Sequence, residues 1–400
     1  MTTAPNARPV LFLASTATHV ETFGPVVRAL GNRQVGSTIL TLDRWYGYGA
    51  WQAGRFGNLP MLETSVPPSP PGPFYRRGTM AIWRDVLSAR RPLADDIGRS
   101  AAGTLVVGND SGLLEKFALD LARRNGWTRF LIQDGRLVER PMPRGAKNRV
   151  RAVARRLASG LMRRLGYPYL GASAYGSGDL TGICASGPAG ARLLANRARP
   201  GVVVHTIGQP RYDALQREHP AASAAGGPIA LFTSPFAVDG YGSAAQEAQL
   251  KLAVDLARAL HGAGSQLVVK PHPRASAPTY AAAVAAGAEV AMSDAATVLR
   301  RCSVAIIGLS TLIEEAAIVH RPVIVPGDFI HHGPLVELLP DTATYPRFET
   351  ASEALALIEQ IVVDSDGHLL AEQESAVQQQ VTHDPARPAA ARVAEVVLGL

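Results

Sequence analysis

Short apolar runs alternate with longer amphipathic segments along most of the chain. The runs are four to six residues long and mostly apolar on both faces, at 10–14, 37–42, 103–108, 129–133, 202–207, 228–233, 266–270, 289–292 and 303–307. Strands that are buried on both faces of a parallel sheet have this composition. Segments with helical periodicity separate them, for example 113–126 and 244–260. The alternation predicts an α/β protein built on parallel sheets, with helices covering their faces.

The length of the chain predicts two domains. Its 400 residues exceed what one hydrophobic core usually organises. The segment 217–227, REHPAASAAGG, is small, polar and without a period, which is typical of a linker. We therefore expect an N-terminal domain over 1–216 and a C-terminal domain over 228–400.

Two motifs in the second half of the chain place polar and charged residues just beyond the carboxyl ends of predicted strands. The first is KPHPR, in which the apolar run 266–270 stops at His272. Neither Pro271 nor Pro273 can continue a strand ladder, so His272 and Arg274 are expected just beyond the strand's carboxyl end. A histidine between prolines is, taken alone, equally well explained as a rigid turn.

The second motif is GLSTLIEEA, which follows the apolar run 303–307. Gly308 permits a close turn, and Ser310 can cap a helix whose apolar face is formed by Leu312, Ile313, Ala316, Ala317 and Val319. Free amides and the helix dipole favour an anion at such a position, and ligands of open α/β sheets gather at strand carboxyl ends. A glycine before a Ser-Thr helix start is often only a cap, but its occurrence beside the His272 motif favours a nucleotide-phosphate site.

These motifs resemble those of a known group of enzymes. The second half of the chain is similar to the C-terminal half of GT-B transferases that build bacterial surface polymers. The similarity lies in KPHPR, then in a strand followed by GLST with Glu314 and Glu315, and then in PVIVPG. That group holds CDP-glycerol glycerophosphotransferases, polysialyltransferases and Kdo transferases, and UDP-N-acetylglucosamine 2-epimerases have a similar half. The resemblance implies two Rossmann-like, doubly wound domains facing a central cleft, with the final helix, near 389–400, packing back on the first domain.

The first half contributes candidates for a general base. His19 and Glu21 lie in the loop after the first strand, in ATHVETFGPVVRAL, which is similar to the first turn of the epimerases and related GT-B enzymes. In the bacterial sialyltransferase-like branch an acidic pair followed by glycine supplies the base. This chain has Gln133-Asp134-Gly135 instead, so the resemblance transfers that role to Asp134 alone. Either Asp134 or His19 is therefore expected to deprotonate the acceptor. Near them, Asp110 or Ser111 is expected to cap the helix of 113–126.

In a transferase of this kind the departing phosphate must be neutralised. Ser310, Thr311 and the amides after Gly308 would bind its oxygens, and His272 would stabilise or protonate it. Glu314 or Glu315 would bind ribose hydroxyls, with Glu315 preferred. The expected catalytic residues are His272, Asp134 and His19, and the expected donor-binding residues are Lys270, Arg274, Gly308, Ser310, Thr311, Glu314 and Glu315.

The net charge is +7, with an isoelectric point near 9.6, which suits an anionic partner. Ten basic residues gather between 136 and 164, against the single acid Glu139. Apolar residues recur at helical spacing over 150–165, which predicts a basic amphipathic helix. An ordinary packed surface helix is the first explanation, and contact with anionic lipid or a lipid-linked acceptor is the second. We expect no nucleic-acid partner.

Several classes of protein are disfavoured. No apolar run is long enough to span a bilayer, and Pro5 and Pro9 interrupt the region where a signal peptide would need its apolar core, so a cytoplasmic protein is expected. Cys184 and Cys302 lie in different predicted domains and are expected to be buried spectators. No Cys/His cluster has zinc spacing, and the adjacent histidines at 331–332 lack a third ligand. The absence of GxGxxG after the first strand disfavours a dinucleotide oxidoreductase, and the absence of GxxxxGK[ST] disfavours a P-loop kinase.

The sequence thus predicts a transferase moving a sugar or polyol-phosphate from a nucleotide-activated donor of the CMP, CDP or UDP type to a cell-surface polysaccharide or glycolipid. We expect the nucleotide to be a substrate, with no cofactor and no metal site. One alternative is a UDP-sugar 2-epimerase. Another is a non-catalytic carbohydrate-binding or scaffold protein that retains the fold, an option that the amide at Gln133 keeps open.

Overall fold

A computed structural model describes residues 8–46, 57–68, 79–135, 157, 160–162, 164–170, 173–217, 226–234, 236, 243–272, 275, 277–308, 310–327, 344–363, 367–382, 384 and 386–400. The chain forms two compact units. Unit 1 comprises 1–137, 141–213 and 380–400, and unit 2 comprises 138–140 and 214–379. The last 21 residues therefore belong with the N-terminal part of the chain.

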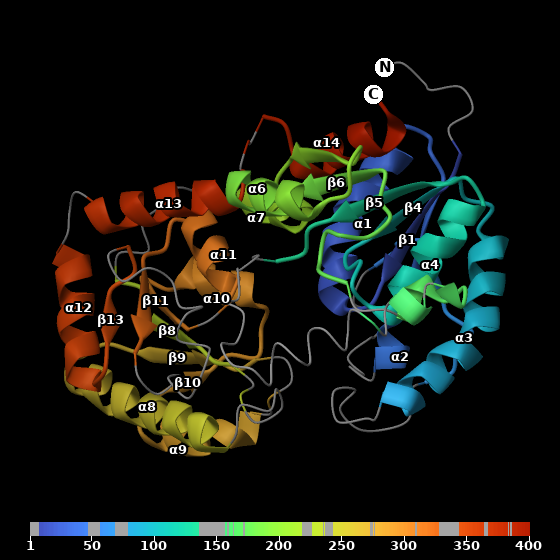
Figure 1. Cartoon of the computed structure of the whole chain (residues 1–400). Coiled ribbons are helices and arrows are strands. Elements are labelled where there is room, and N and C mark those ends of the chain that lie inside the picture. The colour runs from blue at the N-terminus through green and yellow to red at the C-terminus, as the bar shows by residue number, and fades with distance from the viewer. Residues whose placement is uncertain are drawn as a thin grey trace. The chain divides into compact units, whose positions relative to one another are not determined.

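Unit 1 is built on a seven-stranded parallel sheet in the order β3-β2-β1-β4-β5-β6-β7 (Figure 1). The strands are β1 (Val10–Ala14), β2 (Ser37–Thr41), β3 (Met61–Glu63), β4 (Thr104–Val107), β5 (Thr128–Ile132), β6 (Gly182–Ala185) and β7 (Val203–Thr206). All neighbouring pairs are parallel. The strand order reverses direction between β1 and β4, and such a switch point is where open α/β sheets bind ligands.

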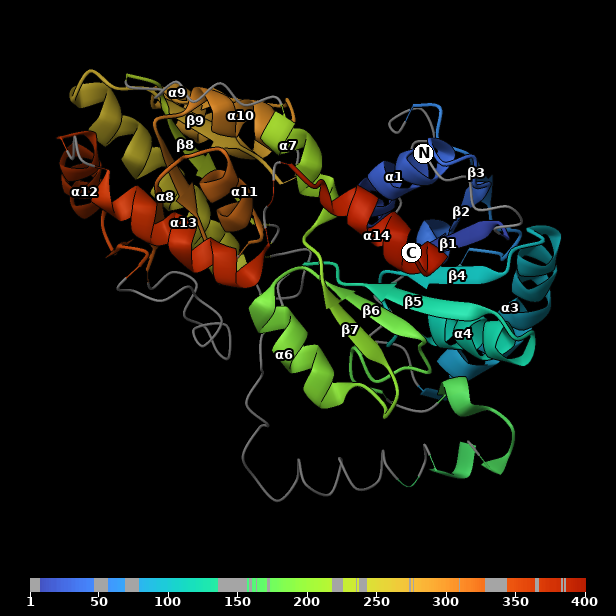
Figure 2. The ribbon, with the colours of Figure 1, turned by 90° about the horizontal axis from the view of Figure 1, so that it is seen from above.

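Helices cover both faces of this sheet. The elements are α1 (Ala17–Gly31), α2 (Asp43–Tyr46), α3 (Thr79–Arg99), α4 (Leu113–Arg124), η3 (Pro168–Leu170), α6 (Pro188–Arg197), η4 (Pro210–Tyr212), α7 (Asp213–Arg217, at the boundary with unit 2) and α14 (Ala389–Leu398). One core layer joins α1 and α14 to the sheet, and the other joins α3 and α4 to its opposite face. Figure 2 shows α14 lying along α1.

A buried aspartate fixes the start of α14. The two carboxylate oxygens of Asp213 accept hydrogen bonds from the backbone amides of Ala389 and Ala390, each at 2.9 Å. The first amides of a helix have no intrahelical acceptor, so a carboxylate at this position satisfies them and also complements the helix dipole. Val393 and Val397 then bury the apolar face of α14 against α1. The C-terminal helix is thereby part of the core of unit 1.

Unit 2 is a second parallel sheet, in the order β10-β9-β8-β11-β12-β13. Its strands are β8 (Ile229–Phe232), β9 (Leu267–Lys270), β10 (Glu289–Val290), β11 (Val304–Ile307), β12 (Val323–Pro326) and β13 (Arg347–Phe348). Its helices are α8 (Ser243–Gly262), η5 (Ala277–Tyr280), α9 (Ala281–Ala285), α10 (Ala295–Arg301), α11 (Leu312–Ile318), α12 (Ala351–Val363) and α13 (His368–Gln380). The fully buried Gln373 attaches α13 to β12, since its amide accepts from the backbone nitrogen of Val323 and donates to its carbonyl, both at 2.8 Å.

The prediction of two parallel α/β sheets is confirmed, and some local predictions are wrong. The helix expected to carry an Asp110 or Ser111 cap begins after Gly112, with no side-chain cap bond. Helix α11 begins at Leu312 with Thr311 in the cap position, although the Ser310 hydroxyl accepts a hydrogen bond from the Leu312 nitrogen, as a cap would. Among the described residues, no helix is both long and apolar enough to cross a membrane.

Candidate functional site

His19 lies at the carboxyl end of β1, in the first turn of α1. Its position follows from the cap of that helix, because the Thr16 side chain accepts a hydrogen bond from the His19 backbone nitrogen at 3.3 Å. His19 is only 4% exposed, and its imidazole lies against Phe23, with ring centroids 5.8 Å apart. The ring is therefore held by the helix start on one side and by an aromatic wall on the other.

The structure brings the two alternative bases into contact. Nε2 of His19 lies 3.3 Å from Oδ2 of Asp134, which follows β5. The other ring nitrogen, Nδ1, accepts a hydrogen bond from the backbone nitrogen of Ser15 at 3.0 Å. Because a backbone N–H can only donate, Nδ1 must carry a lone pair, and the proton of the neutral ring lies on Nε2. His19 therefore presents its proton to the carboxylate.

The remaining carboxylate oxygen of Asp134 is unusual. Oδ1 is out of contact with solvent and has no hydrogen-bond donor among the described residues, although the side chain as a whole is 17% exposed. Burying a carboxylate oxygen without a donor costs free energy, and such groups in native proteins need a specific explanation. A substrate hydroxyl donating to Oδ1 would supply one.

Two residues hold this pair in place. A Cβ atom added to Gly108, which follows β4, would lie 2.5 Å from Cδ2 of His19, so the ring occupies space that only glycine leaves open. The Tyr175 hydroxyl donates to the carbonyl of Gly108 at 3.1 Å and accepts from the backbone nitrogen of Asp134 at 3.2 Å. Burial raises the pKa of Tyr175 well above its usual value, which keeps this bridging hydroxyl protonated. Tyr175 thus ties the ends of β4 and β5 together.

The amide at Gln133 has a structural role that an acid could not fill. Its Nε2 donates to the carbonyl of Gly135 at 2.9 Å, and its Oε1 accepts from the backbone nitrogen of Ser186 at 3.1 Å. An ionised carboxylate could accept the second bond but could not donate the first. Gln133 therefore braces the turn that presents Asp134.

Sequence reasoning missed a second buried carboxylate at this edge. Glu115 is fully buried, and its two oxygens accept hydrogen bonds from the hydroxyls of Ser15 and Tyr46. A signal was available, because Glu115 occupies the helix face that also buries Ala118, Leu119 and Ala122. A charge at a buried position of an amphipathic helix requires partners.

Asp110 fixes a loop rather than a helix start. Its two oxygens accept from the backbone nitrogens of Gly176 and Gly178, at 2.8 and 2.7 Å. Burial raises the pKa of Asp110, against the opposing effect of these hydrogen bonds. The neighbouring Lys116 has its pKa lowered to about 8, mainly by burial. Asp110 therefore positions the loop that carries Tyr175.

In unit 2 the first motif lies where it was expected, beyond β9. The backbone nitrogen of His272 donates to Oγ1 of Thr233 at 3.2 Å, and the buried Tyr280 hydroxyl donates to the same oxygen at 2.8 Å. Nζ of Lys270 is buried and donates to the carbonyl of Pro271 at 2.8 Å. Thr233 thus links the ends of β8 and β9, while Arg274 lies outside the described residues.

The second motif has fewer available amides than predicted. Oγ of Ser310 accepts from the Leu312 nitrogen at 3.2 Å, and the amides of residues 313–315 donate to the carbonyls of Ser310 and Thr311. Among the described residues, the backbone nitrogens of Ser310 and Thr311 have no acceptor. Gly308 and Glu314 are buried, and Glu315 is half-buried. An anion here would be bound by two backbone amides and the Thr311 hydroxyl, a smaller set than a full helix start offers.

Other predicted residues contribute no site within the described part of the chain. Cys184 and Cys302 are buried, and burial raises the pKa of each thiol to about 12. No group of three metal-ligating side chains comes together in the described ranges. The histidines at 331–332 and most of the helix predicted over 150–165 lie outside those ranges.

No protein-family model and no curated sequence matches this chain. Solved structures match over nearly its whole length. The kitacinnamycin glycotransferase has 13% identity and a TM-score of 0.60, covering 98% of this chain and 99% of that chain. A putative UDP-N-acetylglucosamine 2-epimerase from Listeria monocytogenes has 13% identity and a TM-score of 0.59, covering 98% and 96%. Anabaena HepE in complex with UDP-glucose has 11% identity and a TM-score of 0.52, covering 98% and 100%. This chain therefore has the GT-B fold, which glycosyltransferases and UDP-N-acetylglucosamine 2-epimerases share.

Proposed function

We propose that this protein is a glycosyltransferase or polyol-phosphate transferase. It would move a group from a nucleotide-activated donor of the CMP, CDP or UDP type to the hydroxyl of a cell-surface polysaccharide or glycolipid. The observation that carries the proposal is the contact between His19 and Asp134, with one oxygen of Asp134 buried and without a donor among the described residues. A positioned carboxylate is the group that a hydroxyl nucleophile needs as its general base.

In this proposal Asp134 accepts the proton of the acceptor hydroxyl, and His19 is a positioning partner. His19 cannot take that proton in the observed geometry, because Nδ1 is occupied by the Ser15 amide and Nε2 presents its proton to Asp134. Its donated hydrogen bond instead orients the carboxylate. The acceptor hydroxyl would bond to Oδ1, which gives that oxygen the donor it lacks.

Unit 2 would bind the nucleotide. We propose that His272 stabilises or protonates the departing phosphate and that the backbone nitrogens of Ser310 and Thr311 bind its oxygens. Lys270 and Arg274 would add positive charge, so that basic groups perform the neutralisation without a metal ion. Glu314 or Glu315 would bind the ribose hydroxyls. The complexes of HepE with UDP and UDP-glucose support a uridine nucleotide as the first donor to try.

A UDP-sugar 2-epimerase is the second candidate, because the epimerase from Listeria monocytogenes matches this fold as well as the glycotransferase does. The two reactions differ in what they require. An epimerase converts its nucleotide sugar with no second substrate, whereas a transferase releases nucleotide in proportion to the acceptor that it modifies.

The test begins with a thermal-shift screen of CMP, CDP, UDP and GDP, since a ligand at about 100 times its dissociation constant stabilises by roughly 2.7 kcal/mol. Product analysis then follows with the corresponding activated sugars, with and without glycan and glycolipid acceptors. Acceptor-dependent nucleotide release that falls by about 100 to 10,000-fold in Asp134→Asn supports the proposal. A 2-epimer formed without acceptor supports the epimerase, and the absence of any nucleotide binding supports a non-catalytic protein.

A further inference from the structure

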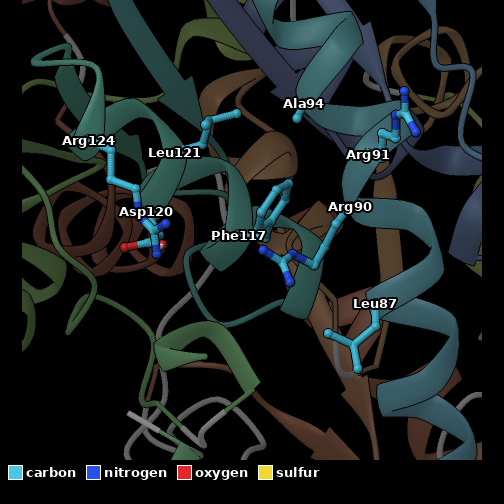
Figure 3. A pocket seen from close by; sticks show the side chains of 8 residues that line it. All are labelled: Leu87, Arg90, Arg91, Ala94, Phe117, Asp120, Leu121 and Arg124. Atoms are coloured by element: carbon cyan, nitrogen blue, oxygen red, sulfur yellow. Dashed lines mark ion pairs between the residues drawn. The ribbon is translucent and has the colours of Figure 1, made fainter. Parts of the chain in front are cut away.

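A pocket of about 360 Å³ lies between α3 and α4 of unit 1. It is lined by Leu87, Arg90, Arg91, Ala94, Phe117, Asp120, Leu121 and Arg124 (Figure 3). Helix α4 starts at the carboxyl end of β4 and runs back along the sheet, so its last turns, where Asp120 and Arg124 lie, are remote from the strand ends that carry Asp134. The pocket is therefore separate from the candidate catalytic residues.

The pocket combines an apolar floor with an excess of positive charge, although one of its arginines, Arg124, pairs with Asp120 at 2.7 Å. Figure 3 shows Arg90 beside Phe117, with Arg124 next to Asp120 on the neighbouring helix. The Arg90 guanidinium lies 5.5 Å from the centroid of the Phe117 ring. Within the described residues, Nε of Arg90 is buried without an acceptor. The three arginines and one aspartate of the lining leave a net charge of +2.

A row of exposed leucines ends two residues before Tyr167, whose ring lies near Arg90 of the pocket. Leu157, Leu161 and Leu165 are 71%, 54% and 56% exposed, and their spacing of four residues places them along one side of a helix. The Leu165 nitrogen donates to the Leu161 carbonyl at 2.9 Å, as in a helical turn. Large apolar side chains exposed together in this way are typical of an interaction surface.

The chain connects the leucine row to the pocket within a few residues. Tyr167 follows Leu165 by two positions and packs against the core of unit 1. The Arg90 guanidinium lies 5.5 Å from the Tyr167 ring centroid and 5.4 Å from that of Tyr169. The two tyrosine rings therefore lie near Arg90 of the pocket, and the last exposed leucine is two residues away from them along the chain.

We propose that this surface, the α3–α4 pocket with the leucine row, docks on an anionic phospholipid membrane. A lipid phosphate binds at Arg90 and Arg124, its glycerol and first methylene groups lie on the apolar floor, and the leucines insert among the acyl chains. A membrane presents negative charge and apolar volume side by side, which matches the pairing of arginines and leucines here. The inference does not depend on the transfer reaction, since it uses none of the residues assigned to catalysis or donor binding.

Sedimentation of the full chain with lipid vesicles tests the proposal at low salt. Vesicles of phosphatidylcholine alone are compared with vesicles containing added phosphatidylglycerol. Wild type is expected to sediment with the anionic vesicles only, and Arg90→Gln to bind them about five-fold more weakly, the effect of one basic residue near such a surface. Because Arg90 also packs on aromatic rings, a second variant, Leu161→Ser with Leu165→Ser, keeps the test valid. These side chains are more than half exposed, so the double variant is expected to fold and to bind about ten-fold more weakly.

Matched controls are Arg192→Gln on α6 and Val362→Ser on α12, which remove an exposed charge and an exposed apolar side chain elsewhere. Both are expected to sediment as wild type does. Absence of wild-type binding to anionic vesicles, or leucine variants that bind as well as the controls, overturns the proposal. A third result also overturns it: glycerol 3-phosphate raises the melting temperature of wild type but not of Arg90→Gln, and wild type does not bind vesicles. That result would assign the pocket to a free phosphate ester. The thermal shift caused by nucleotide is measured in the same variants. If that shift is unchanged while vesicle binding is lost, the loss concerns the membrane surface and not the proposed transfer function.

Discussion

Substituting Gly108 by alanine should disable the candidate catalytic site of unit 1 without removing any of its functional groups. The added Cβ would lie 2.5 Å from Cδ2 and 2.7 Å from Nε2 of His19. Carbon atoms in contact are normally about 3.5 Å apart, so the ring must move by about 1 Å. That displacement is large beside the 3.3 Å contact with Asp134. A misplacement of about 1 Å can lower a rate by about 100-fold, which corresponds to about 2.7 kcal/mol of transition-state stabilisation.

The assay compares acceptor-dependent nucleotide release by wild type, Gly108→Ala and Gly98→Ala. Gly98 lies in α3 with nothing within 4 Å of an added Cβ, so the same substitution there should leave activity unchanged. It should also stabilise the helix slightly, by up to about 1 kcal/mol. Gly108→Ala should lose about 1–3 kcal/mol of unfolding free energy through overpacking and still fold. A folded Gly108→Ala protein with the wild-type kcat/KM would refute the argument that the observed position of His19 matters for transfer.

Three further substitutions probe other parts of the chain. His272→Ala should keep the fold and reduce turnover by about 100 to 10,000-fold, and a folded variant with normal turnover would remove His272 from the mechanism. Ser310→Ala combined with Thr311→Ala should weaken the best nucleotide by about 1–3 kcal/mol in calorimetric titration while backbone donors remain; an unchanged dissociation constant would place the phosphate elsewhere. Asp213→Ala should lower the unfolding free energy by about 2–4 kcal/mol, because it leaves two buried amides at the start of α14 without acceptors. Urea denaturation measures that loss, and Asp213→Asn, which retains one acceptor, should lose less.

Much of the fold could be predicted because its central strands are buried on both faces and therefore consist of uninterrupted apolar residues. The short strands at the edges of the two sheets could not be predicted in this way. β3 and β13 have only three and two residues, too few for a pattern to emerge. Helix α3 continues through Pro92, where local rules predict a break. Its second half is held by Leu93 and Ile97, both fully buried in the core, so tertiary packing outweighs the local cost.

The candidate site could be predicted residue by residue but not as an arrangement. His19 and Asp134 were both identified from strand ends, yet β1 and β5 are separated in the sheet by β4. Strand order is a property of the whole sheet, and no local pattern encodes it. The roles of Tyr175 and Asp110 could not be predicted from the sequence for a related reason. Both act through a loop without periodicity, whose position depends on two backbone amides bonded to a distant carboxylate.

Asp110, Glu115 and Asp134 lie near strand ends of unit 1 and differ in how the hydrogen-bonding capacity of their oxygens is satisfied. Asp110 has a backbone amide on each oxygen, and Glu115 has a hydroxyl on each. Both are fully buried, and their hydrogen bonds offset the cost of that burial. Asp134 has His19 on one oxygen and no donor on the other among the described residues. Of these three side chains, Asp134 alone retains an acceptor position for a substrate hydroxyl, which is why we assign the base to it rather than to the more deeply buried acids.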